Sequence, residues 1–197
     1  MDRNIRIVQK PDTVSWQQVK DCLMEAHMEN RSRGILLSHP LWPAEQIGSF
    51  VEESGVLFVA LDGERVVGTL GVKEKTGNYW FVKGRYAYLC FGSILPDYQG
   101  QGIYKALNDA CEEYIKEKGF KVFAFDTHSL NRHMQEISLK SGFKLVRYFY
   151  VAGSHPHNSV MMAKWVGACP YSDLYCKWRF FVSKMRTFAK TVLYWEK

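Results

Sequence analysis

The alternation of predicted strands and helices along the chain indicates an α/β (α+β) fold, with helices flanking a mixed central sheet. The 197 residues suffice for one full domain and are too few for two. A hydrophobic content of 47% supplies a packed core and argues against global disorder. The sequence contains no internal repeat and no low-complexity linker. We therefore expect one domain over residues 1–167 and a segment of different character over residues 168–197.

The first half of the chain predicts two helices and five strands, separated by glycine, proline and asparagine. Thr13 or Ser15 could cap the first helix, and Asp62-Gly63 is typical of a hairpin turn. A second turn is expected at 76–78. In chain order we expect a strand at 5–9, a helix with its apolar stripe over 14–24, a loop at 31–43, a helix at 44–53, and strands at 56–61, 65–73, 79–82 and 86–95.

The second half predicts helices and strands in turn. Gly119 is a natural end for the first of these helices, because a glycine tolerates the left-handed conformation that closes many helices. In chain order we expect a helix at 103–118, a strand at 121–126, a helix at 131–140, a strand at 143–152, a turn at 153–158 and a last strand at 159–166.

The stretch PDYQGQGIYKAL, residues 96–107, places Gly100 and Gly102 between a predicted strand and a predicted helix. The start of a helix exposes backbone N–H groups that carry partial positive charge and hold anions well, phosphates above all. Glycines give a bulky phosphate access to those groups and allow the dihedral angles of a tight turn. The stretch therefore predicts a diphosphate cradle, and the alternative is that the glycines only shape a turn.

Two familiar phosphate-binding motifs do not fit the stretch. A P-loop needs GxxxxGK followed by Ser or Thr, which the chain lacks. A dinucleotide fingerprint needs a glycine three residues after Gly102, where the chain has Lys105, and it usually occupies the first strand–helix unit.

The pattern Gln99-x-x-Gly102-x-Tyr104, preceded by Pro96 and Tyr98, resembles the acyl-CoA pyrophosphate loop of the GNAT family of N-acetyltransferases. That motif is Gln or Arg, two residues, Gly, one residue, then Gly or Ala. Tyr104 departs from its last position, so its side chain must point away from the phosphates.

The resemblance extends over roughly residues 5–166. Asn131 and the Gly142-Phe143 dipeptide match the family's next strand–helix unit, and VLFVALDGERVVGTL resembles its second and third strands. The resemblance implies a GNAT-like, mostly antiparallel sheet and transfer of an acetyl group from acetyl-CoA to an amine.

The resemblance also implies which residues hold acetyl-CoA. The end of the strand before the glycines would splay from its neighbour and offer backbone groups to the pantetheine and the acetyl carbonyl. Gly92 inside that strand fits a bulge or a barrel-corner kink. Asn131 would contact the cofactor, or would simply cap a helix. The implied cofactor-binding residues are Gly92, Ser93, Ile94, Gly100, Gln101, Gly102, Ile103, Tyr104, Lys105 and Asn131.

The catalytic groups are less well defined. The family often protonates the leaving thiolate with a Tyr seven residues after the Asn, and here that position is Ser138, a poor substitute. Tyr104, His133 and Tyr88 are candidate stand-ins. Asp126 is the candidate general base, provided that burial raises its pKa, and the alternative is an Asp that caps a loop. His128, His133, His155 and His157 could shuttle protons, but their spacing matches no metal motif, so we expect no metal.

Charge and cysteine content indicate which partners and which cellular compartment suit the protein. The net charge of +6 favours anionic partners. The five cysteines are odd in number and lack CxxC spacing, which suggests a reducing compartment. The N-terminal residues lack a signal-peptide core and no apolar run could span a membrane, so we expect a soluble, cytoplasmic protein.

Residues 170–195 predict a basic amphipathic helix. Ser172 could cap it, and one side carries Leu174, Trp178, Phe181, Val182, Met185, Phe188, Ala189 and Val192. Lysines and arginines fill much of the remainder. The helix could pack on its own domain, form a homodimer contact, or lie on an anionic membrane, peripheral to its inner face. No module for nucleic-acid recognition is present, so no nucleic-acid partner is expected.

We thus predict an N-acetyltransferase that acts by direct transfer on a small molecule, an amino sugar or a protein amine. Its acceptor pocket would be formed by residues 31–43, 73–85 and 153–158, with Trp42, Tyr79 and Trp80 suited to a flat-faced acceptor. The alternative, based on the serine at 138, is a non-catalytic acyl-CoA sensor or a membrane-associated scaffold.

Overall fold

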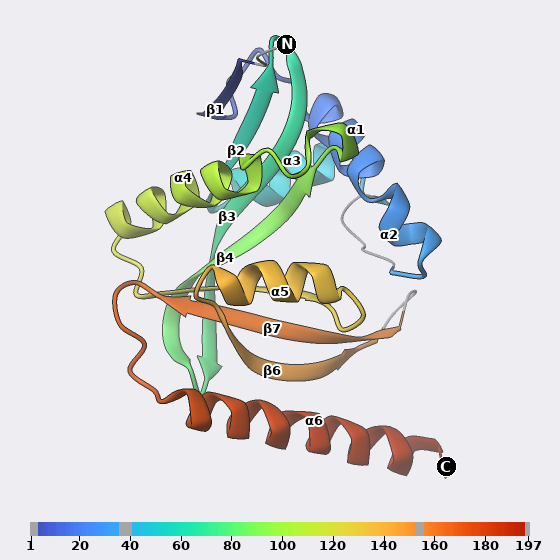
Figure 1. The fold of residues 1–197 in the computed structure, drawn as a ribbon, viewed down its shortest axis with the longest axis vertical. Coiled ribbons are helices and arrows are strands. Elements are labelled where there is room, and N and C mark those ends of the chain that lie inside the picture. Colours follow the sequence, from blue (N-terminus) through green and yellow to red (C-terminus); the bar gives the residue numbers. More distant parts are fainter. Residues whose placement is uncertain (1–3, 36–40, 153–155, 196–197) are drawn as a thin grey trace.

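The computed structural model describes residues 4–35, 41–152 and 156–195 of the chain. A seven-stranded sheet in the order β1-β2-β3-β4-β5-β7-β6 runs through the molecule (Figure 1). Its strands are β1 Ile5–Gln9, β2 Gly55–Asp62, β3 Arg65–Tyr79, β4 Val82–Ile94, β5 Val122–His128, β6 Lys144–Val151 and β7 His157–Trp165. The helices are α1 Trp16–Ala26, α2 Met28–Ser32, α3 Ala44–Glu52, the 3₁₀ turn η2 Pro96–Tyr98, α4 Ile103–Glu117, α5 Arg132–Lys140 and α6 Asp173–Trp195.

All neighbouring strands pair antiparallel except β4 and β5, which pair parallel. The prediction of a mixed, mostly antiparallel sheet is therefore confirmed. One parallel pair requires a crossover, and α4 provides it, because this helix connects β4 to β5.

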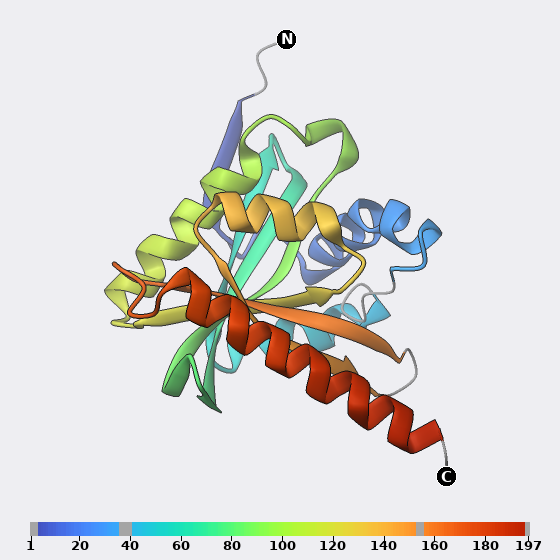
Figure 2. The same ribbon diagram turned by 60° about the horizontal axis from the view of Figure 1, so that its bottom comes forward.

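Helices cover both faces of the sheet. Cys22 of α1 contacts Ser93 on one face, whereas Leu107 of α4 lies against Gly68 and Ile94 on the other. Figures 1 and 2 both show α5 beside α4. The apolar sides of α1 and α4 therefore contribute to the core, where Val19 and Leu107 are fully buried.

Two predicted boundaries need correction. Residues 76–78 form no turn: β3 continues to Tyr79 and the hairpin turns at 80–81, with Tyr79 paired to Val82. The strand predicted at 79–82 is therefore wrong, since the turn falls inside it, and β4 runs without a break through 83–85. Gly77 is glycine for a packing reason, because a Cβ there would lie 2.8 Å from the Tyr79 ring and 3.0 Å from the Tyr86 ring. The predicted loop at 31–43 begins inside α2, and its residues 36–40 lie outside the described chain.

The C-terminal helix α6 lies along β6, the edge strand of the sheet (Figure 1). The backbone N–H of Tyr148 donates to Ser183 Oγ at 2.8 Å, and Thr187 Oγ1 donates to the Tyr148 carbonyl at 3.1 Å. Side chains of α6 therefore satisfy backbone groups that an edge strand would otherwise expose. In the described part of the chain, no helix is both long and apolar enough to cross a membrane.

Candidate active site

The sheet opens where β4 and β5 separate. The two strands pair only at Ala87 with Phe123 and at Tyr88 with Ala124. Beyond these pairs β4 stays with β3, and β5 stays with β7. A cavity of about 1110 Å³ lies at this opening, lined from one side by β4, η2 and α4 and from the other by β5 and α5. The splayed strands expected from the sequence are thus present.

A bulge in β4 shapes one wall of the cavity. The register with β3 shifts between Thr69 and Gly71, opposite residues 91–92. Phe91 has φ of 54°, a conformation that costs energy for a bulky residue, and its carbonyl accepts a hydrogen bond from Thr69 Oγ1. A bulge re-aims backbone groups, and here it does so at Gly92, which lines the cavity.

The residues after the bulge alternate in exposure. Ser93 is buried and its hydroxyl lies 2.7 Å from Thr69 Oγ1, on the α1 face of the sheet, while Gly92 and Ile94 are partly exposed. All three line the cavity. Because the Ser93 hydroxyl is engaged on the far face, this segment offers mainly backbone groups to a ligand.

The glycine loop leads from β4 into α4. Gly100 and Gly102 have φ of 74° and 78°, and Gly102 is the N-cap residue of α4, with no side chain capping the helix. An added Cβ would meet nothing within 4 Å at either glycine. Both positions therefore require glycine for its conformation. The N–H groups in the first turn of α4 have no side-chain cap and lie at the cavity, an arrangement that suits an anion.

Side chains around the loop hold it in place. The Tyr98 hydroxyl donates to Asp62 Oδ2 at 2.8 Å, which ties η2 to the end of β2. Gln101 Nε2 donates to the Asp97 carbonyl at 3.0 Å, so Gln101 stabilises the loop through its side chain and is not among the residues lining the cavity. Gln99, two residues earlier, does line it.

Lys105 and the predicted asparagine, Asn131, lie at the rim of the cavity. Lys105 lines the cavity and forms an exposed ion pair with Asp109. Asn131 is the N-cap of α5: its Oδ1 accepts from the Met134 N–H at 3.3 Å, and its Nδ2 donates to Thr127 Oγ1 at 3.2 Å. Asn131 also lines the cavity, so capping and ligand contact are compatible at this residue.

Asp126 lies on β5, facing Tyr88 of β4 across the opening. The Tyr88 hydroxyl donates a short hydrogen bond to Asp126 Oδ1, and Lys75 Nζ lies 3.4 Å from the centroid of the Tyr88 ring. Burial and the Asp126 carboxylate raise the pKa of the Tyr88 phenol. Burial lowers the pKa of the Lys75 ammonium, and Asp126 opposes that change. The carboxylate is thus held in a fixed orientation at the cavity wall.

Ser138 is fully buried on α5 and is not among the residues lining the cavity. Its hydroxyl makes no hydrogen bond of good geometry within the described chain. Burial, the largest effect, raises the pKa of the nearby Tyr104 phenol, and the Ser138 hydroxyl opposes that change. The cavity-lining phenol of Tyr104 on α4 thus lies beside the position where the family often has its tyrosine.

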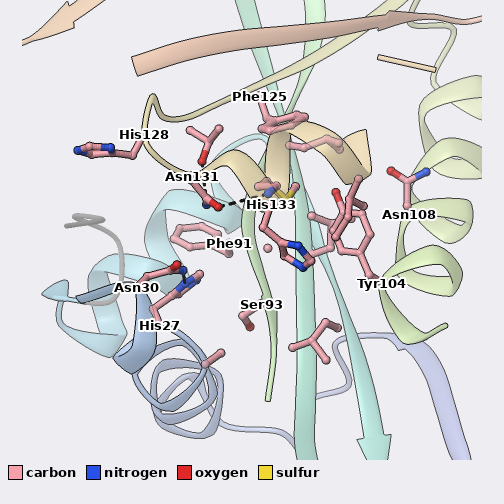
Figure 3. A pocket seen from close by; sticks show the side chains of 18 of the residues that line it. His27, Asn30, Phe91, Ser93, Tyr104, Asn108, Phe125, His128, Asn131 and His133 are labelled. Atoms are coloured by element: carbon pink, nitrogen blue, oxygen red, sulfur yellow. Dashed lines mark hydrogen bonds between the residues drawn. The ribbon is translucent and has the colours of Figure 1, made fainter. Parts of the chain in front are cut away.

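Three of the four histidines expected to shuttle protons line the same cavity, His128, His133 and His157, and the fourth, His155, lies outside the described residues. The His128 and His157 rings stack with centroids 4.8 Å apart, and burial, with a smaller contribution from His157, lowers the pKa of His128. His133 points from α5 toward Tyr104 (Figure 3). His27, whose Nδ1 lies 3.1 Å from Asn30 Nδ2, was not anticipated, because nothing in the sequence indicates that the end of α1 reaches this site.

The aromatic residues expected at the acceptor pocket lie elsewhere. Trp42 packs edge-on against Phe50 and Phe91, and Trp80 Nε1 donates to the Val146 carbonyl at 2.9 Å. Tyr79 stacks on Phe81. These three aromatics serve packing, and none lines the cavity. Within the described residues, no three His, Cys, Asp or Glu side chains are grouped so as to hold a metal ion.

Comparison with known proteins agrees with this geometry. The family model described as Acetyltransferase (GNAT) family matches residues 16–143. A curated relative, N-alpha-acetyltransferase 30 of Schizosaccharomyces pombe, is 28% identical over 96 residues, which is 47% of this chain and 62% of the relative. The chain therefore spans less than two thirds of that relative's length.

Solved structures share the fold. An acetyltransferase from Streptococcus agalactiae has a TM-score of 0.64 at 16% identity, over 83% of this chain and 99% of that one. A GNAT family acetyltransferase from Elizabethkingia anophelis, solved with acetyl-CoA bound, has a TM-score of 0.58 at 15% identity, over 84% of this chain and 100% of that one.

Proposed function

Because the chain belongs to the acetyltransferase (GNAT) family, we propose that it is an N-acetyltransferase that moves the acetyl group of acetyl-CoA directly to an amine. The observation that carries the proposal is the cavity at the parting of β4 and β5, which combines an uncapped helix N-terminus, a bulged strand and a fixed carboxylate. These are the parts that hold a diphosphate, orient a thioester and remove a proton.

The loop and the first turn of α4 would hold the pyrophosphate. We assign its contacts to the backbone of Gly100, Gly102, Ile103 and Tyr104, with Lys105 adding charge at the rim, while Gln101, which does not line the cavity, holds the shape of the loop. The positive φ of Gly100 and Gly102 supports this assignment, since both turn the chain into α4 with no side chain in the way. Gly92, Ser93 and Ile94 would meet the pantetheine and the acetyl carbonyl through their backbone, and Asn131 would contact the cofactor from α5.

Asp126 would act as the general base. The amine nitrogen attacks the thioester carbonyl carbon, a C–N bond forms, and the ammonium proton passes to the carboxylate directly or through a water. The hydrogen bond from Tyr88 supports the role because it fixes one carboxylate oxygen and leaves the other for the proton. His128 and His157, stacked on the same side of the cavity, could carry the proton to solvent.

Tyr104 would take the place of the missing tyrosine at position 138. When the tetrahedral intermediate collapses, the C–S bond breaks and the thiolate leaves. The raised pKa of the Tyr104 phenol keeps it protonated at neutral pH, so it can donate a hydrogen bond to that thiolate. With Tyr104 in this role, the absence of a tyrosine at position 138 is no longer an argument for a non-catalytic sensor.

A peptide α-amine is the acceptor class that we propose to test first. The name of the curated relative, N-alpha-acetyltransferase 30, indicates such acceptors for that protein, and its 28% identity to this chain supports the choice. The volume of the cavity, about 1110 Å³, lies at the upper end of the range for small-ligand sites, which supports a site shared by a cofactor and an acceptor. We place the enzyme in the cytoplasm, since all five cysteines carry free thiols.

The test is turnover with product identification. Purified protein is incubated with acetyl-CoA and a panel of peptides, amino sugars and polyamines, and acetylated products are identified by mass spectrometry. We expect acetylated peptide that is lost in the Asp126→Asn variant. Binding of acetyl-CoA by calorimetry, without acetylation of any acceptor class, would instead support a sensor.

A further inference from the structure

The outer side of α6 carries a continuous apolar stripe. Five large side chains recur at intervals of four and three residues and are between 50% and 78% exposed. They are Leu174, Trp178, Phe181, Met185 and Phe188. This spacing places all five on one side of the helix, so they form one surface instead of scattered apolar contacts. We call these five residues the α6 stripe.

The helix packs on its domain with a different side. Cys176 is buried, Phe180 contacts the Tyr148 ring edge-on at 6.2 Å between centroids, and Ser183 bonds the Tyr148 backbone. The inner side is therefore partly polar, while the more apolar side faces outward. Figure 1 shows α6 as the outermost element at the lower margin of the molecule. The packing of α6 on the sheet therefore does not explain why the exposed side of the helix is apolar.

The charge of α6 limits what can cover the stripe. The helix has five cations between 173 and 190, at Lys177, Arg179, Lys184, Arg186 and Lys190. Its one carboxylate in that span, Asp173, already pairs with Lys144 of β6. Lys177 and Lys184 each follow a stripe residue by three positions and so flank the stripe directly. A partner must therefore bury apolar side chains and supply negative charge.

We propose that the α6 stripe docks on an anionic phospholipid surface, with the helix lying in the interface plane. Lipid headgroups supply the negative charge, and the acyl boundary takes up the Phe, Leu and Met side chains. Trp178 suits the same interface because its ring is apolar and its N–H is polar. A second copy is a weaker match, since antiparallel pairing of two such helices would set Lys177 and Lys184 against the same lysines.

The proposal goes beyond the acetyltransferase activity and does not depend on it. Of the described residues that line the cavity, none belongs to α6, so lipid contact leaves the cavity open. It would place the enzyme at a membrane surface, where acceptors in or near the bilayer are enriched.

The first test is co-sedimentation of the full chain with vesicles. We expect binding to vesicles of phosphatidylglycerol and phosphatidylcholine in equal parts, several-fold weaker binding to phosphatidylcholine alone, and loss of binding at high salt. The variant Leu174→Gln/Phe181→Gln/Phe188→Gln should bind at least about ten-fold more weakly, because it removes most of the buried apolar surface. Replacing Lys177 and Lys184 by Gln should weaken binding to the anionic vesicles only.

The matched control carries three Gln substitutions at exposed apolar residues elsewhere, Met24, Leu41 and Leu139. It should bind vesicles as the unaltered protein does, and both triple variants should keep their thermal unfolding temperature and acetyl-CoA affinity. Failure of the unaltered protein to bind anionic vesicles would overturn the proposal, as would equal binding by the stripe variant. A dimer in analytical ultracentrifugation that the stripe variant converts to monomer, without vesicle binding, would assign the stripe to a second copy.

Discussion

The Tyr88 hydroxyl donates a hydrogen bond to the Asp126 carboxylate across the line where β4 and β5 part. The two residues lie just where the parallel pairing stops, since Tyr88 is in the last paired position of β4. The bond thus joins two strands at the mouth of their separation and orients a carboxylate into the space that opens there. This geometry makes Asp126 the residue on which the proposed mechanism depends most.

Replacing Asp126 by Asn should lower kcat by a factor of about 10² to 10⁴, the usual contribution of a general base. The Kd for acetyl-CoA should stay nearly constant, because the amide keeps the size of the side chain. Steady-state kinetics and calorimetry measure the two quantities. Asp21→Asn, on the exposed side of α1, is the control and should change neither. Equal kcat in the Asp126 and Asp21 variants would remove Asp126 from the mechanism.

Gly102→Ala should weaken acetyl-CoA binding, whereas Gly63→Ala should not. Both glycines have positive φ, 78° and 60°, and in both an added Cβ meets nothing within 4 Å. Each substitution should therefore cost a similar stability, about 1 to 2 kcal/mol, from backbone strain. Of the two, only Gly102 is the N-cap of α4 at the cavity, so a shift of its backbone displaces the N–H groups to which we assign the pyrophosphate.

Calorimetric titration with acetyl-CoA, beside denaturant unfolding of both glycine variants, separates the two effects. If Gly63→Ala weakened binding as much as Gly102→Ala, general destabilisation would explain the loss and the loop would not be the pyrophosphate site. Gly102→Glu, which adds a negative charge, should abolish binding more completely than the alanine variant.

His128 should make the fold less stable in acid. Burial and His157 lower its folded-state pKa below the ordinary value of about 6.5. Between the folded and the unfolded pKa the unfolded chain binds more protons, so stability rises with pH through that window and falls as pH drops below about 6.5. In His128→Gln, the loss of unfolding temperature between neutral pH and about pH 5 should be smaller. An unchanged slope would mean that another group carries the acid sensitivity.

The sequence predicted the sheet, the crossover helix and the glycine loop because each has a local signal: alternation, an apolar stripe, or glycine at a strand–helix junction. It missed the long β3–β4 hairpin, since Gly77 resembles a turn residue until the Tyr79 and Tyr86 rings are seen to pack over it. It predicted the apolar side of α6 but not that this side faces outward, because periodicity does not say which side meets the domain.

The candidate site was predictable only in part, for a related reason. The loop is one continuous segment, whereas the Tyr88–Asp126 bond, the His128–His157 stack and the approach of Tyr104 to Ser138 join residues that the chain keeps 29 or more positions apart. Such contacts depend on tertiary packing, which no single motif encodes.

Moving the tyrosine from position 104 to position 138 should test whether Tyr104 does the work of the tyrosine that the family often has on the next helix. Tyr104→Ala should lower kcat, because the leaving thiolate loses its hydrogen-bond donor, and Ser138→Tyr alone should destabilise the fold by overpacking a fully buried position. The double variant Tyr104→Ala/Ser138→Tyr restores the arrangement often found in the family and opens space for the new ring. We expect it to recover stability and most of the lost kcat.

The variant Tyr104→Phe keeps the ring and removes only the hydroxyl, so it separates packing from chemistry. Full activity in that variant would show that the phenol fills space and donates nothing to the reaction.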